Sequence, residues 1–271
     1  VTVARGNERS RKINEITDEI NKYHKQGIQE IVLTGVHVGG YGNNIDSGLY
    51  KLIDAILNNT HIPRIRLASI EPWDLHEKFF SLFANERLMP HIHLPLQSGC
   101  NKTLKRMARR CKTDDFRSIV NNAREQIKNF NITTDIIVGF PGETNEEWKE
   151  SLKFIKEIGF SHIHIFTYSA REGTKASTFA NQVETSIKKE RSKELHNLSK
   201  SMRKKILNNE IGKEYSVLWE SKDKENNWLG YTDNYIKVML KNYKGDIRNN
   251  ISKIKIVAVA SDINHCIVEL I

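Results

Sequence analysis

The stretch ITTDIIVGFPGETNEEWKESLKFIKEIGF, residues 132–160, predicts a strand, a tight turn and a helix in direct succession. Its first part is apolar, rich in β-branched residues and followed by Gly139, which is typical of a buried strand. Thr144 precedes Glu147 at the spacing of a capping box, which marks the start of a helix. Apolar residues then recur at steps of three and four, so this helix has one apolar face: Trp148, Leu152, Ile155 and Ile158.

The alternation of strand and helix continues on both sides of this unit. A helix is predicted to end at Gly27, and Asp74 with Glu77 marks the start of another. Further strands are predicted at residues 30–35, 64–69, 91–96 and 162–168. Repeated units of this length imply a parallel sheet, closed or partly closed into a barrel. If Val1–Ala4 is the tail of another strand, that strand began before the chain does.

A long helix over 185–208 separates this part from the C-terminal residues. Its predicted buried stripe is Leu195, Leu198, Met202 and Ile206, and its lysines and arginines, Arg191 among them, face either solvent or phosphate. After Gly212 alternation replaces the helical period, with strands predicted at residues 215–220, 235–240, 251–259 and 266–271. Short antiparallel strands of this kind suggest a small OB-like barrel, a shape often used to bind RNA.

The composition points to an anionic partner. The 271 residues carry a formal net charge of +9 and a pI near 9.3, which favours nucleic acid over a purely solubilising role only slightly. No apolar run approaches the length that spans a bilayer. The three cysteines, Cys100, Cys111 and Cys266, form no C-x-x-C pattern, so they read as separate thiols in a reducing, cytoplasmic setting.

Polar and small residues follow several predicted strands, where the working residues of such folds lie. Gln97, Ser98 and Gly99 follow the strand at 91–96, and a basic helix comes next. Two H-x-H pairs, at residues 91–93 and 162–164, could hold zinc or form a hydrogen-bonded barrel interior. No cysteine or carboxylate lies beside either pair in the sequence, so the interior role is expected and no metal site is predicted.

Five segments, taken together and in order, resemble the radical S-adenosylmethionine methylthiotransferases. They are EIVLTGVHVGGYG, RIRLASIEP, HIHLPLQSGCNKTLKRMARR, TTDIIVGFPGET and FTYSAREGTKAS. The later segment WLGYTDNYIKV is similar to the C-terminal TRAM domain of that family, a small RNA-binding barrel. The resemblance therefore implies an incomplete radical-SAM (β/α)6-type barrel over 1–210 and a TRAM domain over 211–271.

Within the family, the chain is most similar to the branch that adds a methylthio group to C2 of N6-threonylcarbamoyladenosine next to the tRNA anticodon. The implied cofactors are S-adenosylmethionine and two [4Fe-4S] clusters. The implied partners are the anticodon stem-loop of tRNA and a reducing protein such as a flavodoxin or ferredoxin, with the enzyme itself a cytoplasmic monomer. Ala4–Gly6 resembles the segment just after the last cluster cysteine, so the C-x-x-x-C-x-x-C loop is expected upstream of Val1 and the fragment itself is expected to be inactive.

The resemblance also implies which residues bind the cofactor and the RNA. The expected S-adenosylmethionine contacts are Thr34, Gly35, Ser69, Glu71, Gln97, Ser98, Gly99, Arg109, Asp135 and Gly139. The expected RNA contacts are Arg171, Lys213, Trp228, Tyr231, Tyr235 and Lys237, with Trp219 in the core. Alternatives are an RNA-binding protein on a non-catalytic scaffold, the isopentenyladenosine branch, and the branch that modifies a ribosomal protein.

Overall fold

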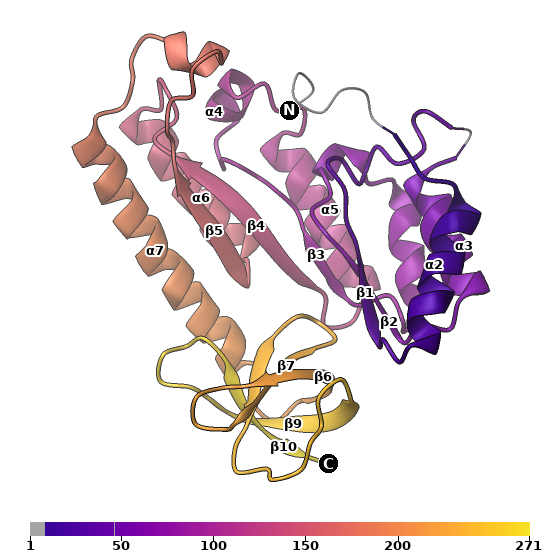
Figure 1. Ribbon diagram of the computed structural model, residues 1–271. Coiled ribbons are helices and arrows are strands. Elements are labelled where there is room, and N and C mark those ends of the chain that lie inside the picture. The colour runs from indigo at the N-terminus through magenta and orange to yellow at the C-terminus, as the bar shows by residue number, and fades with distance from the viewer. Residues whose placement is uncertain (1–8, 46) are drawn as a thin grey trace.

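The computed structural model describes residues 9–45 and 47–271 and contains two barrels, one open and one closed (Figure 1). The predicted strand tail at Val1–Ala4 and the motif at Ala4–Gly6 lie outside the described residues. None of the described helices is both long and apolar enough to cross a membrane.

Five parallel strands form the open barrel, and all five were predicted from the sequence. They are β1 (Glu30–Leu33), β2 (Arg64–Leu67), β3 (His91–His93), β4 (Asn131–Val138) and β5 (His162–Thr167). Parallel ladders join β1 to β2 and β3 to β4 to β5. A bridge between Ser69 and His93 connects β2 with β3, so the strands follow one another in chain order.

Helices cover one face of this sheet (Figure 1). They are α2 (Ile13–Lys25), α3 (Leu49–Asn59), α4 (Asn101–Arg106), α5 (Thr113–Gln126), α6 (Asn145–Ile158) and α7 (Thr185–Asn208), with 3₁₀ turns η1 (Pro72–Asp74), η2 (Glu77–Ala84) and η3 (Lys175–Thr178). Successive strand residues point to opposite faces. On β5, Ile163 is buried under the helices, whereas Phe166 on the inner face is 53% exposed.

The unit from β4 to α6 forms as the sequence predicts. The Thr144 hydroxyl accepts a hydrogen bond from the Glu147 N–H, which completes the predicted capping box. Gly159 ends the helix in the left-handed conformation, at φ 69°. The predicted start of a helix at Asp74 is wrong, because η2 begins after His76 and the Asp74 carboxylate pairs with His37 at 2.7 Å.

The C-terminal residues form a closed five-stranded barrel. Its strands are β6 (Glu214–Lys222), β7 (Trp228–Thr232), β8 (Lys237–Leu240), β9 (Ile251–Val259) and β10 (Cys266–Leu270). The sequence did not predict β7, which is short and contains Gly230. A Cβ at Gly230 would lie 2.4 Å from the Leu218 carbonyl oxygen on β6, so only glycine fits this close pairing. Trp219 is fully buried, as expected.

The small barrel covers the amino-terminal ends of the parallel strands. Arg66 on β2 donates to the carbonyl oxygens of Thr232 and Asp233 at 2.7 and 2.8 Å, and to Glu30 at 2.9 Å. Arg64 shares Glu30 and donates to the Tyr231 carbonyl at 3.2 Å. Burial, together with the charge of Arg66, lowers the pKa of Arg64 to about 10. Two buried guanidinium groups thus tie the two barrels together.

We predict that Arg66→Met destabilises the whole chain. The substitution leaves the Glu30 carboxylate short of a partner and strands two buried carbonyl oxygens, and breaking a buried pair costs about 3–5 kcal/mol. Urea unfolding followed by circular dichroism measures the change. The control, Arg11→Met, removes an exposed pair with Glu19 and is expected to change stability little. Equal midpoints for the two variants would contradict this account of the interface.

Candidate functional site

The site is built at the carboxyl-terminal ends of the parallel strands. After β3 the chain passes through Gln97, whose φ of 69° places a non-glycine residue in the left-handed region. Its backbone is held on β4, because the Gln97 N–H donates to the Asp135 carbonyl at 2.8 Å and the Ile137 N–H donates to the Gln97 carbonyl at 2.9 Å. Strain of this kind persists only where the surroundings enforce it, and it is concentrated at functional sites.

The next residues attach this loop to α6. The Gly99 N–H donates to the Ser151 hydroxyl at 2.8 Å, and a Cβ at Gly99 would lie 2.6 Å from the Ser151 carbonyl oxygen. The Ser98 side chain is buried and accepts from the Cys100 N–H at 3.3 Å. Ser98 and Gly99, which were predicted as cofactor contacts, are buried and position the loop. The partly exposed side chain of Gln97 is more accessible to a ligand than either of them.

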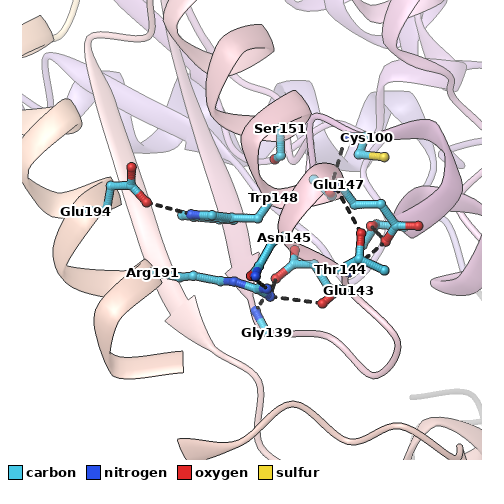
Figure 2. Close-up of polar contacts among 12 residues, drawn as sticks. Cys100, Gly139, Glu143, Thr144, Asn145, Glu147, Trp148, Ser151, Arg191 and Glu194 are labelled. Atoms are coloured by element: carbon cyan, nitrogen blue, oxygen red, sulfur yellow. Dashed lines mark hydrogen bonds and ion pairs between the residues drawn. The ribbon is translucent and has the colours of Figure 1, made fainter. Parts of the chain in front are cut away.

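A buried ion pair holds the loop after β4 (Figure 2). The Glu143 carboxylate accepts from the Gly139 N–H at 2.9 Å and from Arg191 at 2.8 Å, with the two side chains only 1% and 5% exposed. Arg191 also donates to the Glu143 carbonyl and to Asn145. Burial raises the pKa of Glu143, whereas the hydrogen bond from the Gly139 N–H and the positive charge of Arg191 lower it; the net change is upward.

The sequence interpretation of α7 was therefore wrong at Arg191, which is 4% exposed rather than on a charged outer face. Lys188 lies close to the same loop, since a Cβ at Gly139 would lie 2.5 Å from the Lys188 Cγ. The sequence carried no local sign of this arrangement, because Glu143 and Arg191 are 48 positions apart. The N-terminal end of α7 thus fixes the Gly139 turn.

Glu71 and Arg109, both predicted to contact the cofactor, pair with each other. The Arg109 Nη1 donates to both Glu71 carboxylate oxygens at 3.0 Å, and its guanidinium lies 5.3 Å from the centre of the Trp73 ring. The Arg109 side chain remains 18% exposed and the Glu71 side chain 27% exposed, so the guanidinium keeps N–H donors that a ligand can reach. Thr34, Gly35 and Ser69 are exposed at the ends of β1 and β2.

The inner face of the sheet carries a cluster of polar residues below these loops. The His93 ring is hydrogen-bonded to the Thr133 hydroxyl at 2.9 Å and lies 3.2 Å from the Asp135 carboxylate. Side-chain nitrogens of His93 and His164 and an Asp135 oxygen lie within 4.8 Å of one another. No carboxylate lies beside the H-x-H pairs in the sequence, but the fold brings Asp135 of β4 alongside His93 and His164. The hydrogen-bonded interior is observed at His91 and His93.

The three cysteines lie on separate elements: Cys100 precedes α4, Cys111 lies between α4 and α5, and Cys266 is in β10. Burial raises the pKa of Cys111 and of Cys266 to about 12, so both thiols are protonated at neutral pH. Because a cluster needs converging thiolates, these residues do not fit an iron–sulfur site.

The residues predicted to contact RNA do not share one environment. Trp228 is 2% exposed in the small barrel's core, so its predicted stacking role is wrong. Tyr231 and Tyr235 stack on each other at 4.8 Å, and Tyr235 also stacks on His91 at 4.5 Å. Lys213 pairs with Glu210, Lys237 is partly exposed on β8, and Arg171 is exposed in the loop after β5.

Several known proteins are similar to this chain in sequence. A tRNA-2-methylthio-N(6)-dimethylallyladenosine synthase from Staphylococcus epidermidis is 38% identical, with 94% of this chain and 50% of the relative covered. Threonylcarbamoyladenosine tRNA methylthiotransferase MtaB from Bacillus subtilis is 36% identical, with 94% of this chain and 58% of the relative covered. The MtaB of Thermotoga maritima is 38% identical, with 88% and 55% covered. The chain thus spans about half the length of these relatives.

The fold has a counterpart among solved structures. Coproporphyrinogen III oxidase (HemN) from Escherichia coli, a radical SAM enzyme, superposes with a TM-score of 0.52 at 15% identity, over 71% of this chain and 47% of that chain. Residues 2–155 match the family model described as the radical SAM superfamily. With the match covering more than half of its length, the chain belongs to the radical SAM superfamily.

Proposed function

We propose that the chain is part of a tRNA methylthiotransferase that modifies C2 of N6-threonylcarbamoyladenosine beside the anticodon. The observation that carries this proposal is the extended similarity to proteins named for that reaction, which covers both barrels. A second candidate is the corresponding reaction on dimethylallyladenosine, because relatives with that name match the chain to the same extent. The sequence stretches RLASIEP, GGYG and GYTDNY resemble the threonylcarbamoyladenosine branch and favour the first candidate.

Membership of the superfamily implies S-adenosylmethionine and a [4Fe-4S] cluster as cofactors. S-adenosylmethionine has an amino group, a carboxylate and ribose hydroxyls, so its site needs hydrogen-bond donors and acceptors. The strand ends offer these groups in the strained Gln97 and in the partly exposed Glu71–Arg109 pair. The donor set fits the cofactor, which when bound supplies the radical and the methyl group.

The chain's own residues hold and orient this cofactor. In the proposal, Arg109 pairs with the carboxylate, a geometry that guanidinium groups favour. Thr34, Gly35 and Ser69 approach from β1 and β2, and Ser98, Gly99 and Gly139 present backbone. One Asp135 oxygen faces His93, and the other accepts from a ribose hydroxyl. The buried Glu143–Arg191 pair keeps the Gly139 turn in place before the cofactor arrives, which lowers the ordering cost of binding.

The cluster is a different case, because the residues present do not fit it. In the proposal its ligands, a second cluster and the contact with a reducing protein belong to a part of the enzyme outside this chain. The tRNA would lie along the exposed lysines of α7 and the small barrel, with Arg171, Lys213, Lys237, Tyr231 and Tyr235 as candidate contacts. A net charge of +9 supports an electrostatic contribution to that binding.

We predict that Gln97→Gly weakens S-adenosylmethionine binding at least about tenfold without lowering stability, since one lost hydrogen bond to a charged ligand has that size. Glycine keeps the positive φ that Gln97 adopts, so the loop retains its shape. Equilibrium dialysis with labelled cofactor measures the affinity. Gln126→Gly, on the exposed side of α5, is the control for binding. Unchanged affinity in Gln97→Gly would remove this residue from the site.

We predict that the chain, reconstituted with iron and sulfide under anaerobic conditions, holds no stoichiometric cubane cluster and produces no 5′-deoxyadenosine. The physical reason is that the three thiols lie on separate elements and that burial raises the pKa of each, so they neither converge nor ionise readily. Iron counting and a reductive cleavage assay measure the two quantities. A full cluster together with cofactor cleavage would show that ligands other than the expected upstream loop suffice.

The function itself is tested by nucleoside analysis of tRNA from a strain that lacks the gene. Loss of 2-methylthio-N6-threonylcarbamoyladenosine, restored by the complete gene, is the expected result. Loss of the methylthio-dimethylallyl nucleoside instead would assign the second candidate. If both nucleosides persist unchanged, the chain does not belong to a tRNA methylthiotransferase, and the binding-protein and ribosomal-protein alternatives become the ones to examine.

A further inference from the structure

The last parallel strand leaves two side chains uncovered on the inner face of the open barrel. His164 is exposed and Phe166 is 53% exposed, whereas Ile163 on the opposite face is 4% exposed in the core. Residues two apart on a strand lie on one face about 6.6 Å apart. An aromatic ring and an imidazole therefore stand side by side just below the strand ends where we propose that the cofactor binds.

The surroundings of His164 are polar but leave it available. Among the described residues its ring contacts only other rings, those of His93 and His162, with centroid distances of 5.5 and 4.6 Å. His93 is engaged by Thr133 and Asp135. His162 lies 3.0 Å from a guanidinium nitrogen of Arg203, and burial lowers its pKa to about 4, so it is neutral. His164 is thus the imidazole of this cluster that a ligand can reach.

We propose that His164 and Phe166 form the subsite for the modified adenine, with Phe166 stacking on the base and His164 hydrogen-bonding a polar N6 substituent. This inference rests on the proposed function and gives it a structural basis for choosing between the two candidate nucleosides. Enzymes that act on a base take it out of the stack and hold it against aromatic side chains. Phe166 provides such a ring.

The chemistry of the subsite favours a threonylcarbamoyl group over a dimethylallyl group. The threonylcarbamoyl group carries urea N–H groups, a carbonyl, a hydroxyl and a carboxylate, so it offers both donors and acceptors to the His164 imidazole. A dimethylallyl group is a hydrocarbon and offers neither. Covering the His164 imidazole with it would remove water from a polar group and give it no hydrogen-bond partner in return, and sites of this kind discriminate strongly against such analogues.

The test compares this chain with His164→Phe, Phe166→Ala and the control His61→Phe, an exposed histidine in the loop before β2. Fluorescence anisotropy measures binding to anticodon stem-loops that carry N6-threonylcarbamoyladenosine, N6-dimethylallyladenosine or unmodified adenosine. We expect the parent chain and His61→Phe to prefer the threonylcarbamoyl form at least about tenfold. His164→Phe should abolish that preference by weakening the threonylcarbamoyl form selectively, and Phe166→Ala should weaken the binding of all three RNAs, because each of them carries the adenine base.

Other outcomes separate the inference from the proposed function. Binding of free N6-threonylcarbamoyladenosine that depends on His164, without any binding of stem-loops, would sustain the subsite and remove the tRNA part of the proposed function. Strong stem-loop binding in which His164→Phe behaves like the parent chain would sustain RNA binding and overturn the subsite. An equal loss for all three RNAs in His164→Phe, or no binding of RNA or nucleoside by the parent chain, also overturns it.

Discussion

Buried polar groups need hydrogen-bond partners, and this requirement organises the inner face of the open barrel. The outer face is apolar and packs under helices, but the inner face carries arginines, histidines and carboxylates. At the amino-terminal ends of the strands, Arg64 and Arg66 pair with Glu30 and donate hydrogen bonds to backbone carbonyls of the small barrel. Further along the inner face, the His93 ring is hydrogen-bonded to the Thr133 hydroxyl and lies beside the Asp135 carboxylate. Further toward the strand ends, His164 and Phe166 are exposed among the described residues, and this is where we propose that a ligand binds.

Helix α7 connects the two ends of this arrangement. Near its start, Arg191 holds the Glu143 carboxylate and with it the Gly139 turn (Figure 2). Near its end, Arg203 donates to the carbonyls of Ile263 and Asn264, and Leu207 packs in the small barrel's core. The same helix carries exposed lysines between these points. A helix face with exposed lysines thus lies on the same element that fixes the loop that we propose presents backbone to the cofactor.

The proposed chemistry divides between this chain and a part of the enzyme outside it. The chain provides the parallel strands, polar groups at their carboxyl-terminal ends and a second, closed barrel. Its three cysteines lie on separate elements, and burial raises the pKa of each thiol. Sequence identities of 38% and 36% do not distinguish between the two modified adenosines as substrates. In our proposal, the polar and aromatic side chains on the inner face of β5 make that distinction. A hydrocarbon and a charged urea derivative differ enough for a few side chains to separate them.

The sequence by itself determined the elements whose signals are local. All five parallel strands, the capping box at Thr144 and the glycine that ends α6 follow from β-branched runs, capping residues and helical period. It did not determine β7, whose Gly230 is required by a neighbouring strand, or the burial of Trp228 and Arg191, which follows from contacts with residues far away in the chain. Only the tertiary structure paired Glu71 with Arg109 and brought Asp135 to the histidines. Local propensity acts within a few residues, whereas burial and ion pairing depend on which strands and helices the fold makes neighbours.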